Sequence, residues 1–260
     1  MKVLGIESAA LVASVALVTD QAVTAEYTVN FKKTHSQTLL PMIDEITRML
    51  ELDLETVDAI AVSGGPGSFT GLRIGSATAK GLGLALKKPL IHVPTLDAMA
   101  YNLYGTQALI CPVMDARRQQ VYTGLYRYER EFTVVKESCA MDIHDLIREL
   151  NDRGERVIFL GDGVTAYETV IRQEMAAPFD LAPAQVNRQR AASVAALGSV
   201  YLAEGKTETA AEHKPDYLKK AQAERELEEA KRQGKTQELA AGHSVGTGNT
   251  PDTEPPEVKG

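Results

Sequence analysis

The stretch GGPGSFTGLRIGSATAKGLGLAL, residues 64–86, follows a short apolar segment at 58–63 and carries the most unusual pattern in the chain. Its opening glycines and Pro66 predict a tight turn, because glycine accepts a positive φ at little cost. Ser68 or Thr70 would cap the helix that follows, and free amides at a helix start favour an anion. The loop lacks the Gly-Lys-Ser/Thr ending of a Walker A motif, so phosphate binding and simple chain reversal both remain open.

Small residues recur every four positions along the predicted helix, at Gly71, Gly75, Ala79 and Gly83. This spacing places them on one face. Each glycine costs about 1 kcal/mol relative to alanine in a helix interior, and close approach of another backbone is the natural compensation. The spacing alone leaves two interpretations: tight packing inside the protein, or a helix–helix interface with a partner.

The segments on either side of this stretch predict a duplicated α/β architecture. The first half predicts strands at 2–8, 12–20 and 23–30, a helix at 35–50, a strand at 58–63, the glycine loop with its helix, a strand at 90–93 and a helix from 95. The second half repeats the order with strands at 108–115, 120–128 and 132–137, a helix at 143–151, a strand at 156–160 and the loop GDG at 161–163. We expect two α/β lobes, residues 1–107 and 108–218, with any ligand between them.

Composition narrows the class of protein. The 28 Lys and Arg residues stand against 35 Asp and Glu, and the net charge of −7 disfavours binding to nucleic acid or anionic lipid by bulk charge. Two cysteines fit a reducing cytosol. Glu7 interrupts the apolar opening, which favours strands over a signal peptide, and we expect a cytoplasmic protein with no membrane contact. Residues 219–260 lack aromatic side chains and predict a charged, largely disordered tail.

Several motifs together resemble the TsaB (YeaZ) family. They are HSQ at 35–37, GPGSFTGLRIG at 65–75, VPTLDAMA at 93–100, MDARRQQVYTGLY at 114–126 and PDYLKKAQAE at 215–224. The resemblance spans about residues 1–224 and implies a two-lobed fold of the actin/Hsp70/sugar-kinase (ASKHA) type. It also implies a non-catalytic partner of TsaD. TsaD transfers a threonylcarbamoyl group to N6 of the adenosine 3′ of the anticodon (t6A formation), in tRNAs that read codons beginning with A.

The same resemblance shows which residues this chain would need in order to bind the metal of TsaD-like enzymes. TsaD-like enzymes bind a metal through His-x-x-x-His on a helix, and the matching positions here are Thr95 and Met99, which are not ordinary ligands. His92 is nearby but out of register, and the five histidines show no pair at helical spacing. We therefore expect no metal site and no catalytic residue. ATP and metal are expected on the partner subunits, with no cofactor bound by this chain alone.

The nucleotide hairpins of this fold are degenerate as well. ATPases of the class use Asp-x-Gly-Ser/Thr in each lobe, so that backbone amides reach the phosphates. The first hairpin here reads Glu-Ser-Ala-Ala from residue 7, and the second reads Asp-Ala-Arg-Arg from residue 115. At most a vestigial nucleotide cleft is expected, with candidate residues Glu7, Ser8, Asp115, Arg118, Gly161 and Gly163.

The resemblance places the partner surface on the helix at 35–50 and on the helix after the glycine loop. These would pair with TsaD, or with a second copy (a homodimer) when TsaD is absent, and the ATPase TsaE would be a third member. The candidate interface residues are Leu39, Ile43, Ile46, Gly71, Gly75 and Ala79. Gly75→Leu is expected to weaken TsaD binding without unfolding the protein, and tRNA would be met only through the complex.

Two other functions remain open. An active small-molecule kinase of the same fold would bind ATP, which the degenerate hairpins argue against. A metallopeptidase would need metal ligands, which the histidine spacing does not supply.

Overall fold

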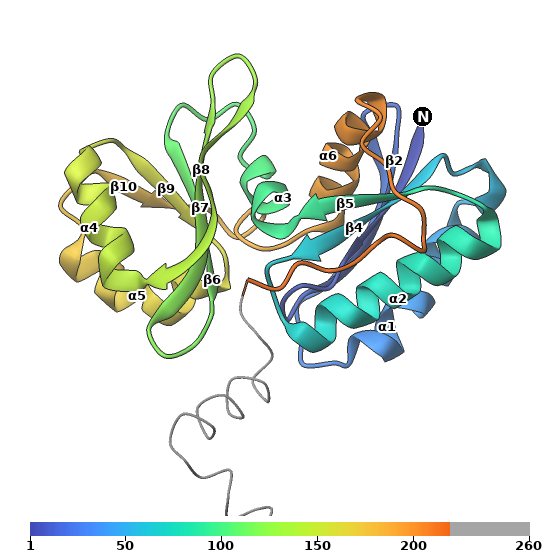
Figure 1. Cartoon of the computed structure of the whole chain (residues 1–260), viewed down its shortest axis with the longest axis horizontal. Helices are drawn as coiled ribbons and strands as arrows, with labels where there is room; N and C mark the ends of the chain where they lie inside the picture. The colour runs from blue at the N-terminus through green and yellow to red at the C-terminus, as the bar shows by residue number, and fades with distance from the viewer. Residues whose placement is uncertain (219–260) are drawn as a thin grey trace, which may run out of the picture. The chain divides into compact units, whose positions relative to one another are not determined.

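Two five-stranded sheets organise residues 1–218, the part of the chain that the computed structural model describes (Figure 1). The first lobe contains β1 (Lys2–Glu7), β2 (Ala13–Thr19), β3 (Ala22–Val29), α1 (His35–Met49), the 3-10 helix η1 (Leu54–Thr56), β4 (Ala59–Gly65), α2 (Phe69–Leu86), β5 (Leu90–Pro94) and α3 (Thr95–Tyr101). The second contains β6 (Leu109–Asp115), β7 (Gln120–Tyr128), β8 (Phe132–Asp142), α4 (Ile143–Arg153), β9 (Val157–Leu160), α5 (Asp162–Glu174) and β10 (Phe179–Leu181). A last helix, α6, spans Ala191–Ala203.

The predicted duplication is confirmed by the topology. The strands run β3-β2-β1-β4-β5 in one sheet and β10-β9-β6-β7-β8 in the other. In each sheet the first strand of the lobe is antiparallel to the second and parallel to the fourth. β8 continues to Asp142, five residues beyond the predicted end, because its second half also pairs with β7. The predicted tail, 219–260, lies outside the described residues.

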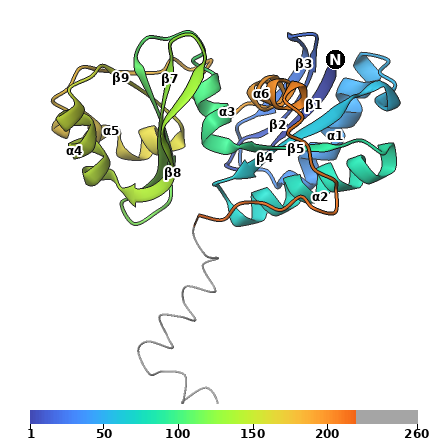
Figure 2. The same cartoon turned by 45° about the horizontal axis from the view of Figure 1, so that its top comes forward.

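The central strand β1 is apolar along most of its length because helices cover both faces of its sheet. Leu4 and Ile6 pack in a core with α1 and α2, whereas Val3 packs in a second core with α6. Figure 2 shows α6 on one side of this sheet and α2 on the other. α6 lies close: a Cβ at Gly5 would be 2.4 Å from the carbonyl oxygen of Ala191.

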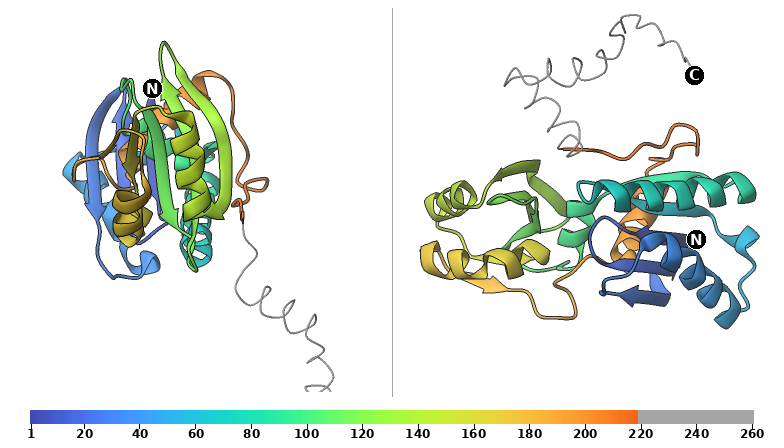
Figure 3. Two further views of the ribbon diagram at one scale, coloured as in Figure 1. Left: turned by 90° about the vertical axis from the view of Figure 1, so that its left-hand side faces the viewer. Right: turned by 90° about the horizontal axis from the view of Figure 1, so that it is seen from below.

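The predicted boundary of the second lobe is wrong at its C-terminal end. α6 and the residues after it return to the first lobe, where Val194, Ala195 and Leu197 pack on β1, β4 and β5. The physical reason is that α6 is apolar on nearly every side and needs a buried site, which the open face of the first sheet provides. Figure 3 shows the last described segment, in orange, returning past α2. Glu208 bridges to Leu90 at the sheet edge.

An apolar cluster joins the two lobes. Leu72, Leu96 and Met99 of the first lobe pack against Ile110, Met114, Tyr126 and Leu160 of the second. The Tyr126 hydroxyl donates a 2.8 Å hydrogen bond to Asp97 Oδ1, and both side chains are buried. Among residues 1–218 no helix combines the length and the apolar character that crossing a bilayer demands.

Candidate partner interface and vestigial nucleotide cleft

The residues predicted for the partner interface lie in the interior of the first lobe. Leu39, Ile43, Ile46 and Ala79 are at most 5% exposed and belong to the core beneath α1 and α2. Gly71 and Gly75 are buried too. These six residues are therefore not exposed to a partner, because the apolar face of an amphipathic helix covers its own sheet first.

The glycine stripe of α2 is needed for a close approach to Ser8, the residue that follows β1. A Cβ at Gly71 would lie 2.1 Å from the Ser8 carbonyl oxygen, and one at Gly75 would lie 2.1 Å from Ser8 Oγ. The Ser8 hydroxyl also donates to the Gly71 carbonyl at 2.9 Å. Internal packing is thus the correct interpretation of this stripe. The expectation that Gly75→Leu leaves the fold intact is wrong, since leucine would overlap Ser8.

The opposite face of the same helices is exposed, and we call it the outer face of α1 and α2. It consists of Leu40, Pro41, Asp44, Ala77, Gly81, Leu84 and Ala85. Leu40 is 55% exposed and Leu84 is 70% exposed. A Cβ at Gly81 would meet nothing within 4 Å. This face offers apolar and small side chains to a second protein, and the sequence prediction had chosen the other side of the same helices.

The first predicted phosphate hairpin is closed by contacts within the chain. Glu7 is fully buried, its Oε1 accepts a 2.6 Å bond from the Ala9 amide, and burial raises its pKa to about 7. Ser8 is occupied by α2. At the start of α2, the Ser68 amide donates to the Ala9 carbonyl at 2.6 Å, so this amide is not free to bind a phosphate oxygen. Ser68 also caps the helix as predicted, accepting from the Gly71 amide.

The glycine loop is likewise held by the chain itself. The Gly65 amide donates to Thr95 Oγ1 at 3.2 Å, and the Gly64 carbonyl accepts from the Asp216 amide at 2.6 Å. Thr95, which matched a metal-ligand position, thus positions this loop. Met99, at the other matched position, packs in the cluster between the lobes. These contacts favour chain reversal over phosphate binding.

The second hairpin brings together part of the predicted cleft. Asp115 Oδ1 accepts from the Arg117 amide at 2.8 Å and from the Tyr167 hydroxyl at 3.0 Å. The Asp115 amide donates to Asp162 Oδ2 at 3.4 Å, and burial raises the pKa of Asp162. Arg117, Arg118 and Gln119 all adopt positive φ. The bulky residue in the glycine position therefore turns the hairpin at a backbone cost.

Gly161 and Gly163 support the packing of the second lobe. A Cβ at Gly161 would lie 2.1 Å from the Val113 carbonyl oxygen and 2.8 Å from Met99 Cε, and one at Gly163 would lie 2.7 Å from Val113 Cγ1. Asp115, Gly161 and Gly163 thus meet at the end of β6, whereas Glu7 and Ser8 are held against α2 and β4. The predicted residues form two separate sets in the described contacts, and an apolar cluster packs between the lobes.

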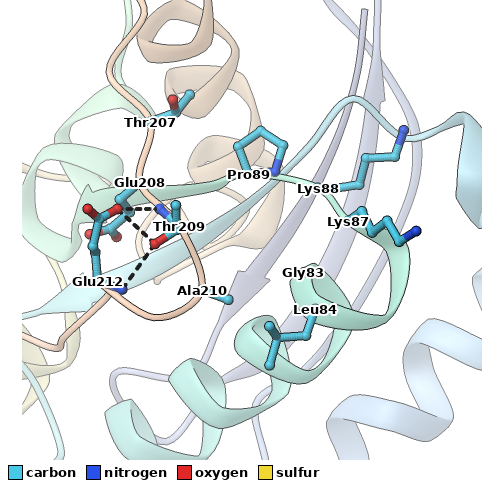
Figure 4. Close-up of a pocket in the computed structure, with 10 residues that line it drawn as sticks. All are labelled: Gly83, Leu84, Lys87, Lys88, Pro89, Thr207, Glu208, Thr209, Ala210 and Glu212. Carbon is cyan, nitrogen blue, oxygen red and sulfur yellow. Dashed lines mark hydrogen bonds between the residues drawn. The ribbon is translucent and has the colours of Figure 1, made fainter.

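Sequence reasoning missed a group of donors on the first lobe. His92, Glu208 and His213 each place one ligand atom within 4.8 Å of the others. Two cavities, of about 430 and 390 Å³, lie beside this group, and Glu208 lines both. Figure 4 shows the larger one, between the end of α2 and the segment 207–212. The sequence shows His92 and His213 only as isolated histidines, and because they are far apart along the chain, no local motif indicates that they meet.

Two α/β lobes whose sheets share one strand order, joined by an apolar cluster, place this chain in the class of actin/Hsp70/sugar-kinase-like (ASKHA) folds. Residues 23–227 match the family described as "TsaD: tRNA N6-adenosine threonylcarbamoyltransferase". The tRNA threonylcarbamoyladenosine biosynthesis protein TsaB of Bacillus subtilis is 32% identical over 228 residues, which are 86% of this chain and 96% of the relative. The Escherichia coli protein of the same name is 30% identical, covering 84% and 95%.

A solved structure agrees with these relatives. YeaZ from Pseudomonas aeruginosa superimposes with a TM-score of 0.69 at 26% identity, over 84% of this chain and 99% of that one. The chain belongs to the TsaB (YeaZ) family.

Proposed function

We propose that this chain is the non-catalytic partner subunit of TsaD in t6A formation on tRNA, and that it acts in the cytoplasm. Family membership supports the role in t6A biosynthesis, since the relatives carry that function in their names. The observation that carries the non-catalytic part is the first hairpin, where Glu7, Ser8 and the Ser68 amide are all engaged within the chain. ATP and the catalytic metal belong, in this proposal, to TsaD and TsaE.

The partner surface in this proposal is the outer face of α1 and α2. Leu40 and Leu84 supply exposed apolar area, and Gly81 permits a second helix to approach the backbone of α2 closely. The same face would join two copies of the chain when TsaD is absent. tRNA would be met through the assembled complex, because the net charge of −7 gives this chain little attraction for phosphates.

The kinase alternative has less support. It needs free amides and a hydroxyl at the hairpins, and Ser8 and the start of α2 are already hydrogen-bonded inside the first lobe. At the second hairpin Arg117 occupies the position of the motif's glycine, so the close backbone approach that phosphates need is missing there.

Size-exclusion chromatography with light scattering, on the chain alone and mixed with TsaD of the same organism, tests the proposal. We expect a homodimer that exchanges into a complex with TsaD. Gly81→Leu and Leu84→Glu should each weaken that complex at least about tenfold while the isolated variants stay folded. Val135→Glu, which places the same charge on an exposed valine of the second lobe, is the matched control and should bind normally.

Two results would contradict it. Full TsaD binding by both outer-face variants would move the interface elsewhere on the chain. If the wild-type chain does not bind TsaD but binds ATP in a calorimetric titration, the kinase alternative would be favoured instead.

A further inference from the structure

Four side chains with metal-binding atoms converge at the outer edge of β5, where the segment after α6 bridges to this strand. His92 lies on this strand, while Glu208, His213 and Asp216 belong to the segment that follows α6. His213 Nδ1 is 2.5 Å from Glu208 Oε1, and His92 Nε2 is 3.1 Å from Asp216 Oδ2. The ligand atoms of His92, Glu208 and His213 lie within 4.8 Å of one another. A cation about 2.0–2.2 Å from each donor therefore needs only small side-chain movements.

His213 carries an independent sign of a missing ligand. Its side chain has no exposed surface, and its Nε2 has no hydrogen-bond partner among the described residues. A buried polar atom without a partner is uncommon in folded proteins and costs about 1–3 kcal/mol.

The glycine loop is shaped around this group. A Cβ at Gly64 would lie 2.1–2.5 Å from three atoms of the His92 ring, so only glycine leaves room for the imidazole. A Cβ at Gly65 would lie 2.2 Å from the carbonyl oxygen of Asp216. Two glycines of the motif that first suggested phosphate binding thus accommodate His92 and the backbone of Asp216.

The donor atoms restrict the kind of ion and its role. Two imidazoles with a carboxylate are typical of zinc-class cations rather than of calcium or magnesium, which prefer oxygen. Two positive side chains lie nearby: Lys80 is close to His213, and Lys206 lines the adjacent cavity, where its ammonium group pairs with Glu204 at 2.7 Å. Complete burial of one ligand suits a closed, structural site better than an open, catalytic one.

We propose that His92, Glu208 and His213 bind one divalent cation of the zinc class, with Asp216 available as a fourth donor. The ion fastens the segment 204–218 to the edge of β5. This revises the expectation that the chain binds no metal of its own, which rested on Thr95, Met99 and helical spacing. The inference does not depend on the role in t6A formation.

Isothermal titration of the untagged, EDTA-treated full chain with Zn²⁺ tests the site. We expect one ion per chain, and His92→Gln should weaken its binding at least about tenfold, because losing a ligand costs no less than losing an outer-shell partner. His92→Gln is preferred to a change at His213, whose burial makes misfolding a risk. The control is His144→Gln, which removes a surface histidine paired with Glu174 at 2.8 Å and should leave binding unchanged.

Two further readouts separate specific from incidental binding. Zn²⁺ should raise the melting temperature of the wild type and of His144→Gln but not of His92→Gln, because only a site in the folded state stabilises the fold. Co²⁺ in place of Zn²⁺ should give visible absorption bands that His92→Gln abolishes. Equal zinc affinity in the wild type and His92→Gln, or no zinc binding by the wild type, would overturn the proposal.

Discussion

At the scale of single residues, Glu7 shows how the environment changes what a carboxylate does. In the sequence it resembles the acidic residue of a phosphate hairpin at a strand end. In the structure it is fully buried, Oε2 has no hydrogen-bond partner among the described residues, and burial raises its pKa from 4.5 to about 7. Burial therefore favours the neutral form of this carboxyl below about pH 7, and the side chain is not presented to a ligand.

Glu7 therefore couples stability to pH. The folded state keeps its proton up to about pH 7, whereas the unfolded chain releases it near pH 4.5, so stability falls as the pH rises through this window. The loss should reach roughly 3 kcal/mol and stop above pH 7. Glu7→Gln should melt like the wild type at pH 4.5 and at a higher temperature at pH 8. Equal melting temperatures of Glu7→Gln and the wild type at pH 8 would show that burial does not raise the pKa of Glu7.

At the scale of one element, α2 carries small residues on two faces. Gly71, Gly75 and Ala79 face the core, while Ala77, Gly81 and Ala85 are exposed. Both sets have the same four-residue spacing, so periodicity identifies the helix but not the side that is covered. The close approach of Gly71 to the Ser8 carbonyl determines which side of α2 is buried, and these two residues are distant in the chain.

Alanine at the two faces should have opposite effects on the free energy of unfolding. Gly71→Ala would force a Cβ to within 2.1 Å of a backbone oxygen and should destabilise the chain by about 1–3 kcal/mol. Gly81→Ala meets open space and should stabilise it by up to about 1 kcal/mol. Urea denaturation of the two variants measures both signs. A stabilised Gly71→Ala variant would disprove the close approach.

At the scale of the whole molecule, the lobes are connected through their cores. Met99 of α3 lies against Gly161, and Tyr126 of β7 donates a buried hydrogen bond to Asp97 of α3. The last described segment reinforces the first lobe, since α6 packs on its sheet and the ring of Tyr217 lies beside that of Phe69, with centroids 4.8 Å apart. The described contacts therefore make a single compact unit of residues 1–218.

Removing the Tyr126 hydroxyl should weaken the junction between the lobes. Tyr126→Phe leaves a buried oxygen of Asp97 with one fewer donor and should lower the free energy of unfolding by about 1–3 kcal/mol. Tyr128→Phe removes a hydroxyl that bonds Tyr104 at the surface and should change it by less than about 1 kcal/mol. Chemical denaturation of both variants compares the two sites. Equal changes in the free energy of unfolding for the two variants would mean that the buried hydrogen bond stabilises the fold no more than the surface one.

The amino-acid sequence by itself determined the order of the elements, their duplication, the Ser68 cap and the family. These follow from periodicity, turn residues and short motifs, which are local properties. Only the tertiary structure decided which face of α2 is exposed, that α6 returns to the first lobe, and that His92 meets His213. Each of these depends on surfaces far apart in the chain competing for the same buried area, and no local pattern records the outcome of that competition.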